Sequence, residues 1–172
     1  MNIQMRVLLT AFIAAGTLSS CSSTEAGSPV VPTPTQGSPT AAPSSANLAE
    51  IKACELLEQL VANQGFSKGE NVSRRNQCTV SKPGYGSKGL ALDDSQGLAE
   101  FQRTDPASVE INLNGRRALQ TKSSGGACDV AIEVSEKARA LAGVTLSDPD
   151  ADGCPEALKF AEQVEPLLPK AQ

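Results

Sequence analysis

The chain has no histidine and no tryptophan, and its 172 residues include only four phenylalanines and one tyrosine. Without histidine, neither a Ser-His-Asp triad nor a Cys-His pair can form, which excludes the commonest arrangements for nucleophilic catalysis. No Ser-x-x-Lys run and no phosphate-binding loop is present either. The sequence therefore predicts a protein that is not an enzyme and that needs no cofactor.

Basic clusters and long apolar runs are also missing. The chain carries 15 Lys and Arg residues against 19 Asp and Glu residues, a net charge of −4, and the basic residues are scattered. This excludes the charge pattern of a nucleic-acid-binding protein. The longest apolar run, residues 7–16, is shorter than the roughly 20 residues that cross a bilayer.

The N-terminal residues have the pattern of a bacterial lipoprotein signal. Arg6 is followed by the apolar run, and small residues then lead to Cys21 in Leu-Ser-Ser-Cys. We expect residues 1–20 to be removed and Cys21 to be lipidated, which places the protein on the extracytoplasmic face of the cell membrane. An ordinary secretory signal with a chance cysteine is the alternative.

Residues 21–46 form the expected tether. Ser, Thr, Pro, Ala and Gly dominate this stretch, and almost nothing in it could form a hydrophobic core. Its composition is typical of a passive spacer or of an O-glycosylated stem. The single folded domain is therefore expected at residues 47–172, a length that suits one core.

Four cysteines remain once Cys21 is assigned to the lipid: Cys54, Cys78, Cys128 and Cys154. An even number of cysteines in an exported domain predicts two disulfides, with three possible connectivities. We expect neighbours in sequence to pair, Cys54 with Cys78 and Cys128 with Cys154. A zinc site or a redox pair is less compatible, because the chain has no Cys-x-x-Cys motif and no histidine.

Apolar spacing predicts the secondary structure of the domain. Residues 48–61 have the period of an amphipathic helix, and a second helix begins at Pro155. Alternating or β-branched runs predict strands at 77–81, 90–92, 109–113, 116–122 and 128–134. Residues 137–146 fit either a helix or a strand. Strands bracketed by a helix at each end predict an α+β fold, an antiparallel sheet covered by the N-terminal and C-terminal helices.

The chain resembles a family of actinobacterial, mycobacterial-type cell-surface lipoproteins whose C-terminal domain has no assigned function. The resemblance rests on the lipobox with its Ser/Thr/Pro stem and on six short motifs. These are Ala53-Cys54-Glu55-Leu56-Leu57, Gln77-Cys78-Thr79-Val80, Asn114-Gly115-Arg116-Arg117-Ala118, Cys128-Asp129-Val130-Ala131-Ile132, Cys154-Pro155-Glu156-Ala157 and Pro166-Leu167-Leu168-Pro169. It implies a disulfide-bonded domain on the cell surface, and it implies no activity.

The segment Asp148-Pro-Asp150-Ala-Asp152-Gly resembles the first half of a calcium loop, so these three carboxylates are a weak calcium candidate. Lys159, however, occupies the position where such a loop needs a bidentate glutamate. The alternative is acidic charge before a helix, where the helix dipole favours it. We expect no metal site here.

Other charged residues suggest further hypotheses. Asp93, Asp94 and Glu100 are the carboxylates that a hydrolase or transferase could use. The pairs Arg74-Arg75 and Arg116-Arg117 could hold an anionic lipid or a wall polymer, although solvated strand ends explain them as well.

We expect a lipid-anchored cell-envelope lipoprotein whose domain is a non-enzymatic binding or interaction module. Its partner would be an envelope protein, a polymer or a lipid, with no nucleic acid. A carboxylate-dependent envelope hydrolase or transferase, a small lipid carrier and a purely structural surface protein are the alternatives.

Overall fold

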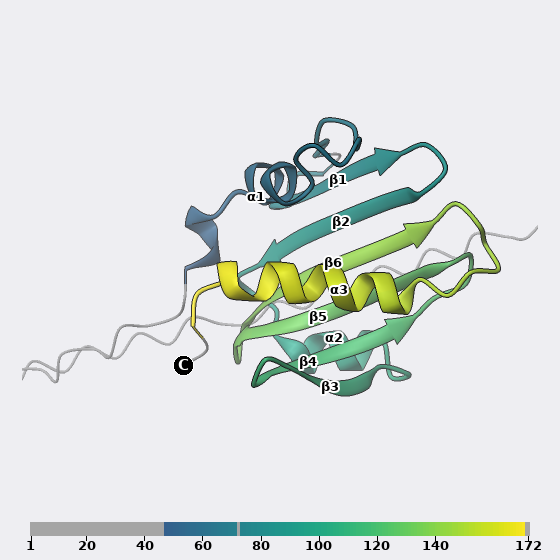
Figure 1. Ribbon diagram of the computed structural model, residues 1–172. Coiled ribbons are helices and arrows are strands. Elements are labelled where there is room, and N and C mark those ends of the chain that lie inside the picture. The colour runs from purple at the N-terminus through teal and green to yellow at the C-terminus, as the bar shows by residue number, and fades with distance from the viewer. Residues whose placement is uncertain (1–46, 72, 171–172) are drawn as a thin grey trace, which may run out of the picture. The chain divides into compact units, whose positions relative to one another are not determined.

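A six-stranded antiparallel sheet forms the centre of the domain, in the strand order β1-β2-β6-β5-β4-β3 (Figure 1). The structure is a computed structural model that describes residues 47–71 and 73–170. The strands are β1 (Gln77–Lys82), β2 (Gly86–Asp93), β3 (Val109–Leu113), β4 (Arg116–Lys122), β5 (Ala127–Ser135) and β6 (Ala138–Leu146). The helical segments are η1 (Leu48–Glu50), α1 (Ala53–Leu60), α2 (Leu98–Thr104), α3 (Cys154–Val164) and η2 (Glu165–Leu167). The expected α+β fold is confirmed.

Helices cover the two faces of the sheet unequally. The N-terminal α1 and the C-terminal α3 pack on one face, which we call the inner face, and α2 lies on the opposite, outer face (Figure 1). Alternate residues of each strand point to each face, so the inner face presents the main hydrophobic core. None of the described helices is long and apolar enough to cross a membrane.

The ambiguous segment 137–146 is a strand at the centre of the sheet. β6 pairs with β2 on one side and with β5 on the other, and its inner-face alanines at 138, 140 and 142 are at most 2% exposed. Small side chains there allow α3 to pack closely against the sheet. The alanine content that favours a helix in the sequence thus serves helix-on-sheet packing.

The expected helix at 48–61 is interrupted, and this part of the prediction is wrong. The chain is extended at Ile51 and Lys52, which separates η1 from α1. The side chain of Asn76 satisfies the backbone at this break: its Nδ2 donates to the Ile51 carbonyl at 2.6 Å, and its Oδ1 accepts from the Ala53 N–H at 2.9 Å. A residue 23 positions away from Ala53 therefore fixes the break, and periodicity alone could not reveal it.

Both expected disulfides are confirmed. Cys54–Cys78 joins α1 to β1, and Cys128–Cys154 joins β5 to α3. Each bond ties one helix to the inner face of the sheet. The two helices that cover the main core are therefore both covalently attached to the sheet.

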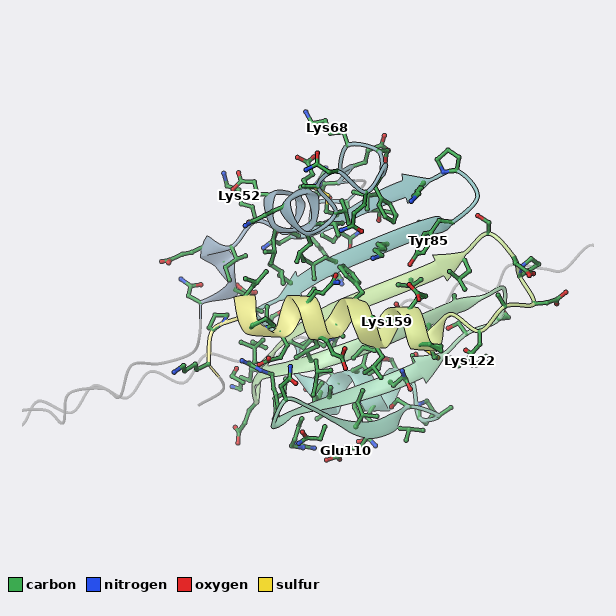
Figure 2. The ribbon with its side chains drawn as sticks, in the orientation of Figure 1. Lys52, Lys68, Tyr85, Glu110, Lys122 and Lys159 are labelled. Atoms are coloured by element: carbon green, nitrogen blue, oxygen red, sulfur yellow. A yellow bond between two sulfur atoms is a disulfide. The ribbon has the colours of Figure 1, made fainter. Side chains whose placement is uncertain are left out.

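The amine of a lysine is enclosed among aromatic rings in this core. Lys88 is 8% exposed, and its Nζ lies 5.1 Å from the ring centre of Phe160, 5.4 Å from that of Phe66 and 5.7 Å from that of Tyr85. Burial lowers the pKa of Lys88, while the Glu156 carboxylate acts against this shift. Tyr85, labelled in Figure 2, has its pKa raised to about 12 by burial and by the same carboxylate. Three of the few aromatic rings thus surround one amine.

Candidate functional site

The outer face of the sheet is only partly covered. Leu98 and Phe101 of α2 pack on Leu119, Ala131 and Leu141, which lie in one cross-strand row. The same row continues to Ala91 in β2 and Gln77 in β1, beyond the reach of this cluster. Among the residues that the structure describes, no α-helix therefore packs on the β1–β2 end of the outer face.

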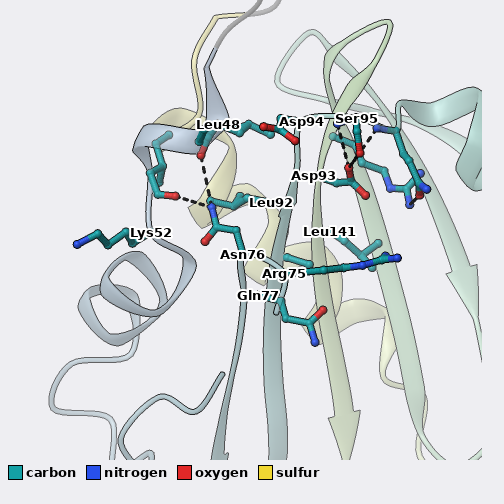
Figure 3. A pocket seen from close by; sticks show the side chains of 15 residues that line it. Leu48, Lys52, Arg75, Asn76, Gln77, Leu92, Asp93, Asp94, Ser95 and Leu141 are labelled. Carbon is teal, nitrogen blue, oxygen red and sulfur yellow. Dashed lines mark hydrogen bonds between the residues drawn. The ribbon is translucent and has the colours of Figure 1, made fainter. Parts of the chain in front are cut away.

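A hollow of about 510 Å³ occupies this end of the outer face (Figure 3). Ala91, Leu92 and Leu141 contribute its apolar side, while η1 and the β2–α2 turn form its walls. We call it the outer-face hollow. Its volume lies within the range of about 300–1,000 Å³ that is usual for small-molecule sites.

Two glycines extend the hollow across the sheet. Gly89 in β2 and Gly143 in β6 are cross-strand partners, and Thr79 and Asp129 flank them in the same row. A further hollow of about 160 Å³ lies here, and it shares Gln77, Ala91 and Leu141 with the larger one. We call it the glycine trough. A Cβ at Gly143 would lie 2.4 Å from the Asp129 carboxylate, so any larger residue at this position would require the Asp129 side chain to move.

Asp129 is a half-buried carboxylate at the end of the trough. Burial raises its pKa, and the negative charge of Asp105 raises it further. Asp105 itself accepts a hydrogen bond from the Thr121 hydroxyl at 3.0 Å. The trough therefore ends at an acid that holds its proton more tightly than an ordinary aspartate.

Asp93 holds the β2–α2 turn that forms one wall of the hollow. Its Oδ1 accepts hydrogen bonds from the Ser95 hydroxyl, the Ser95 N–H and the Gln96 N–H at 2.8, 3.0 and 3.1 Å. Partial burial acts to raise the pKa of Asp93, but these hydrogen bonds and the charge of Arg139 outweigh it and lower the pKa. Asp93 therefore stays ionised, with its charge compensated inside the turn.

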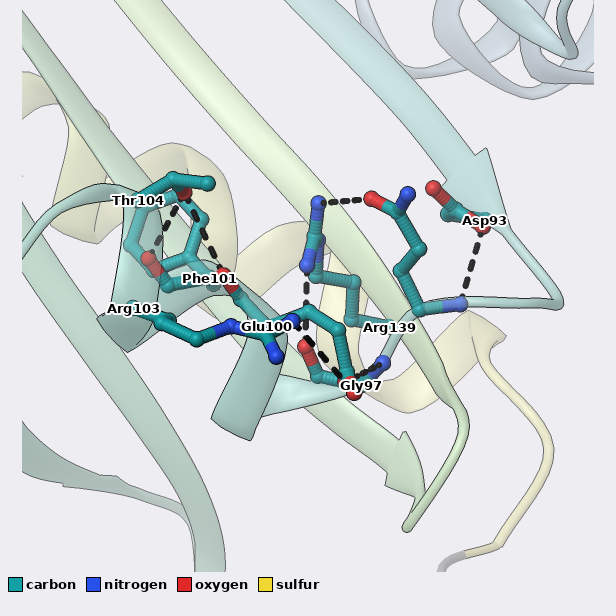
Figure 4. Close-up of polar contacts among 8 residues, drawn as sticks. Asp93, Gly97, Glu100, Phe101, Arg103, Thr104 and Arg139 are labelled. Atoms are coloured by element: carbon teal, nitrogen blue, oxygen red, sulfur yellow. Dashed lines mark hydrogen bonds and ion pairs between the residues drawn. The ribbon is translucent and has the colours of Figure 1, made fainter. Parts of the chain in front are cut away.

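Arg139 anchors the start of α2 to the sheet (Figure 4). Its guanidinium donates to the Gly97 carbonyl at 2.8 Å and to the Gln96 side chain at 3.1 Å, and it lies 5.4 Å from the Phe101 ring centre. Glu100 accepts a hydrogen bond from the Gly97 N–H at 2.9 Å, which caps α2. Glu100 does not line the hollow, so the three carboxylates considered for hydrolysis do not all meet there.

Two charged side chains at the hollow remain without a partner among the described residues. Arg75 and Asp94 are both exposed, both line the hollow, and neither forms an ion pair or a side-chain hydrogen bond there. Lys52, the third exposed charge of the lining, pairs with Glu55 at 3.2 Å on the side of α1. Figure 3 shows Arg75 extended across the strands in the direction of Leu141.

The side chains of the second arginine pair, Arg116-Arg117, are both held in ion pairs. Arg116 points to the inner face, where it pairs with Glu165 at 2.9 Å, while Arg117 points outward and pairs with Glu110 and Glu133. Neighbouring strand residues point to opposite faces, so the two guanidinium groups cannot act together on one ligand.

The acidic run before α3 is held by local bonds. Asp148 accepts from the Asp150 N–H, Asp152 accepts from the Cys154 N–H, and Lys122, labelled in Figure 2, pairs with Asp152 at 3.2 Å. In the described part of the chain no group of three or more His, Cys, Asp or Glu side chains is arranged to hold a metal ion. Cys21, the expected lipidation site, lies outside the described residues.

A serine motif was missed in the sequence. Residues 65–69 read Gly-Phe-Ser-Lys-Gly, which matches the nucleophile-elbow pattern. In the structure, the Ser67 hydroxyl donates to the Lys68 carbonyl and accepts from the Ser81 N–H, so it fastens a loop to the edge of β1. In the described part of the chain no strand precedes Ser67, and the sequence has no histidine that could act as its base.

Comparisons with protein-family models, with curated proteins and with solved structures found no match for this chain.

Proposed function

We propose that this protein is a lipid-anchored lipoprotein of the cell envelope, and that its folded domain is a non-enzymatic binding module. The Leu-Ser-Ser-Cys sequence ending at Cys21 and the Ser/Thr/Pro-rich stretch after it support the anchor and the tether. Two disulfides support an exported location, because such bonds persist in oxidising compartments.

The outer-face hollow is the observation on which the binding role depends. A sheet end without a helix packed on it exposes an apolar floor, and here charged and amide side chains surround that floor. Apolar surface combined with a few polar groups is typical of ligand sites. The hollow opens where β1 begins and β2 ends, so its lining joins Ala91 and Leu141 of the outer face to Leu48 and Leu92, which also belong to the main core.

Position-specific photo-crosslinking in living cells tests the binding role. A photo-reactive residue replaces Ala49, which is exposed at the rim of the hollow, or Lys159, which is exposed on α3 over the inner face (Figure 2). We expect adducts, identified by intact mass and peptide mapping, at Ala49 and not at Lys159. Equal labelling at both positions would show that the hollow is not a binding surface.

The anchor has its own test. Cys21→Ser should move the protein from the membrane fraction to the soluble extracytoplasmic fraction and remove the lipid mass from the mature chain. Retention of the variant in the membrane fraction would show that another segment holds the protein there.

A further inference from the structure

The charges at the outer-face hollow have opposite signs and different origins. Arg75 comes from the segment that precedes β1, and Asp94 comes from the turn that follows β2. The other charges of the lining are already compensated: Asp93 by Arg139 and by its turn, and Lys52 by Glu55. The hollow therefore has one positive and one negative group still available to a ligand.

The lining also includes apolar side chains. Ala91 and Leu141 are half-buried cross-strand partners on the outer face, and Leu92, which also belongs to the main core, is 6% exposed. A ligand with only an anionic group could pair with Arg75 but would leave Asp94 without a partner, and one with only a cationic group would do the reverse. A ligand that carries both charges can pair with both residues, which gives the better charge complementarity.

We infer that the outer-face hollow binds a small zwitterion with an apolar side chain, namely a free amino acid or a short peptide. The carboxylate of the ligand pairs with Arg75, its ammonium group pairs with Asp94, and its side chains lie on the floor formed by Ala91 and Leu141. Arginine suits a carboxylate because its guanidinium offers two parallel donors. This inference rests on the proposed function, since it assigns a ligand class to the same site.

Titration calorimetry with four dipeptides tests the pairing of charges. The full chain, purified in detergent, is titrated with leucyl-leucine, with its N-acetylated form, with its C-terminal amide and with glycyl-glycine. The two variants are Arg75→Gln and Asp94→Asn. Their matched controls are Lys68→Gln and Glu162→Gln, which remove the same charges at exposed positions outside the lining of the hollow.

Blocking one end of the dipeptide should weaken binding as much as removing the side chain that pairs with that end. A hydrogen bond to a charged group contributes enough that its loss weakens binding roughly 10- to 100-fold. We expect acetylation to weaken binding to the unaltered chain and to Arg75→Gln, but to have little further effect on Asp94→Asn. Amidation should weaken binding to the unaltered chain and to Asp94→Asn, but should have little further effect on binding to Arg75→Gln. Glycyl-glycine should bind more weakly than leucyl-leucine, and the control variants should bind like the unaltered chain.

Several outcomes would overturn the inference. Equal affinity for the capped and uncapped dipeptides would exclude recognition of both termini. Binding of vesicles that contain phosphatidylethanolamine, without binding of any dipeptide, would assign the two charges to a zwitterionic lipid headgroup instead. If no dipeptide binds but crosslinks still form at Ala49, the binding role stands and only the ligand class is wrong. If both are absent, the binding role is wrong as well.

Discussion

Arg116 and Arg117 are adjacent in β4, yet their substitution should have very different consequences. Arg116 and Glu165 are 7% and 14% exposed in their side chains, and the guanidinium also donates to the Glu133 and Pro169 carbonyls at 3.0 and 2.9 Å. Arg117 is 57% exposed and pairs with Glu110, which is 59% exposed, and with Glu133, which is 23% exposed. The two residues therefore form a matched pair of one side-chain type in one strand.

Arg116→Met should strongly destabilise the domain. The substitution removes the charge and leaves two carbonyls without this donor, while the Glu165 carboxylate keeps the Asn114 amide as its donor at 3.4 Å but loses its cation. Breaking a buried ion pair from one side costs about 3–5 kcal/mol. That loss is a large part of the roughly 5–15 kcal/mol by which a domain is stable. Arg117→Met should leave the free energy of unfolding nearly unchanged, because exposed ion pairs contribute little.

Urea unfolding followed by circular dichroism measures both changes. The double variant Arg116→Met with Glu165→Leu should recover the part of the lost stability that comes from the unpaired carboxylate, since two apolar side chains can replace a buried ion pair at little cost, while the two carbonyls still lack their donor. If Arg116→Met unfolds at the same urea concentration as Arg117→Met, the buried Arg116–Glu165 pair does not contribute to the free energy of unfolding as argued. If the double variant recovers nothing, the loss belongs to the two carbonyl hydrogen bonds and to the packing of the arginine stem rather than to the ion pair.

Three further predictions concern the Cys128–Cys154 disulfide and the two aspartates whose pKa is shifted. Replacing Cys128 and Cys154 by alanine opens a loop with a sequence separation of 26 and should lower the free energy of unfolding by about 3.5 kcal/mol, measured by urea unfolding without reductant. The pKa of Asp129 is raised in the folded state, so the native protein binds more protons than the unfolded chain between the two pKa values, and stability falls as pH rises through that interval. Asp129→Asn should therefore be more stable than the unaltered chain at neutral pH, with the difference vanishing at acid pH; a difference independent of pH would refute this. The pKa of Asp93 is lowered, so its contribution is present above the unfolded pKa and is lost as pH falls through the folded pKa. Asp93→Asn should be less stable at neutral pH and indistinguishable from the unaltered chain in acid, and a gain in stability at neutral pH would contradict the assignment.

Local patterns in the sequence predicted most of the sheet. Alternation identifies strands such as β5, and the Asn114-Gly115 pair marks the turn between β3 and β4, where both residues have positive φ. The pattern at 137–146 is ambiguous because its alanines are small for packing against α3, a helix that comes later in the sequence. The short α2 was missed, since its seven residues depend on capping by Glu100 and on the Arg139 contact to the Gly97 carbonyl.

The candidate site was only partly foreseeable. Asp93, Asp94 and Arg75 were singled out as charged residues, and all three line the hollow. Their roles were not evident, because the partners that compensate Asp93 become known only from the geometry of the turn. The hollow itself depends on which part of the outer face α2 leaves open, and no local pattern encodes that.

The position of η1 has a mechanical consequence. The described domain begins at Asn47, and the next residues, Leu48 and Ala49, already belong to the wall of the hollow. Any pulling force transmitted along the preceding chain must therefore enter the domain through this wall. The Asn76 side chain resists it with hydrogen bonds to the Leu48 and Ile51 carbonyls and to the Ala53 N–H. Stretching the chain would load these three bonds together with the buried Leu48 side chain, so tension and occupancy of the hollow should be linked.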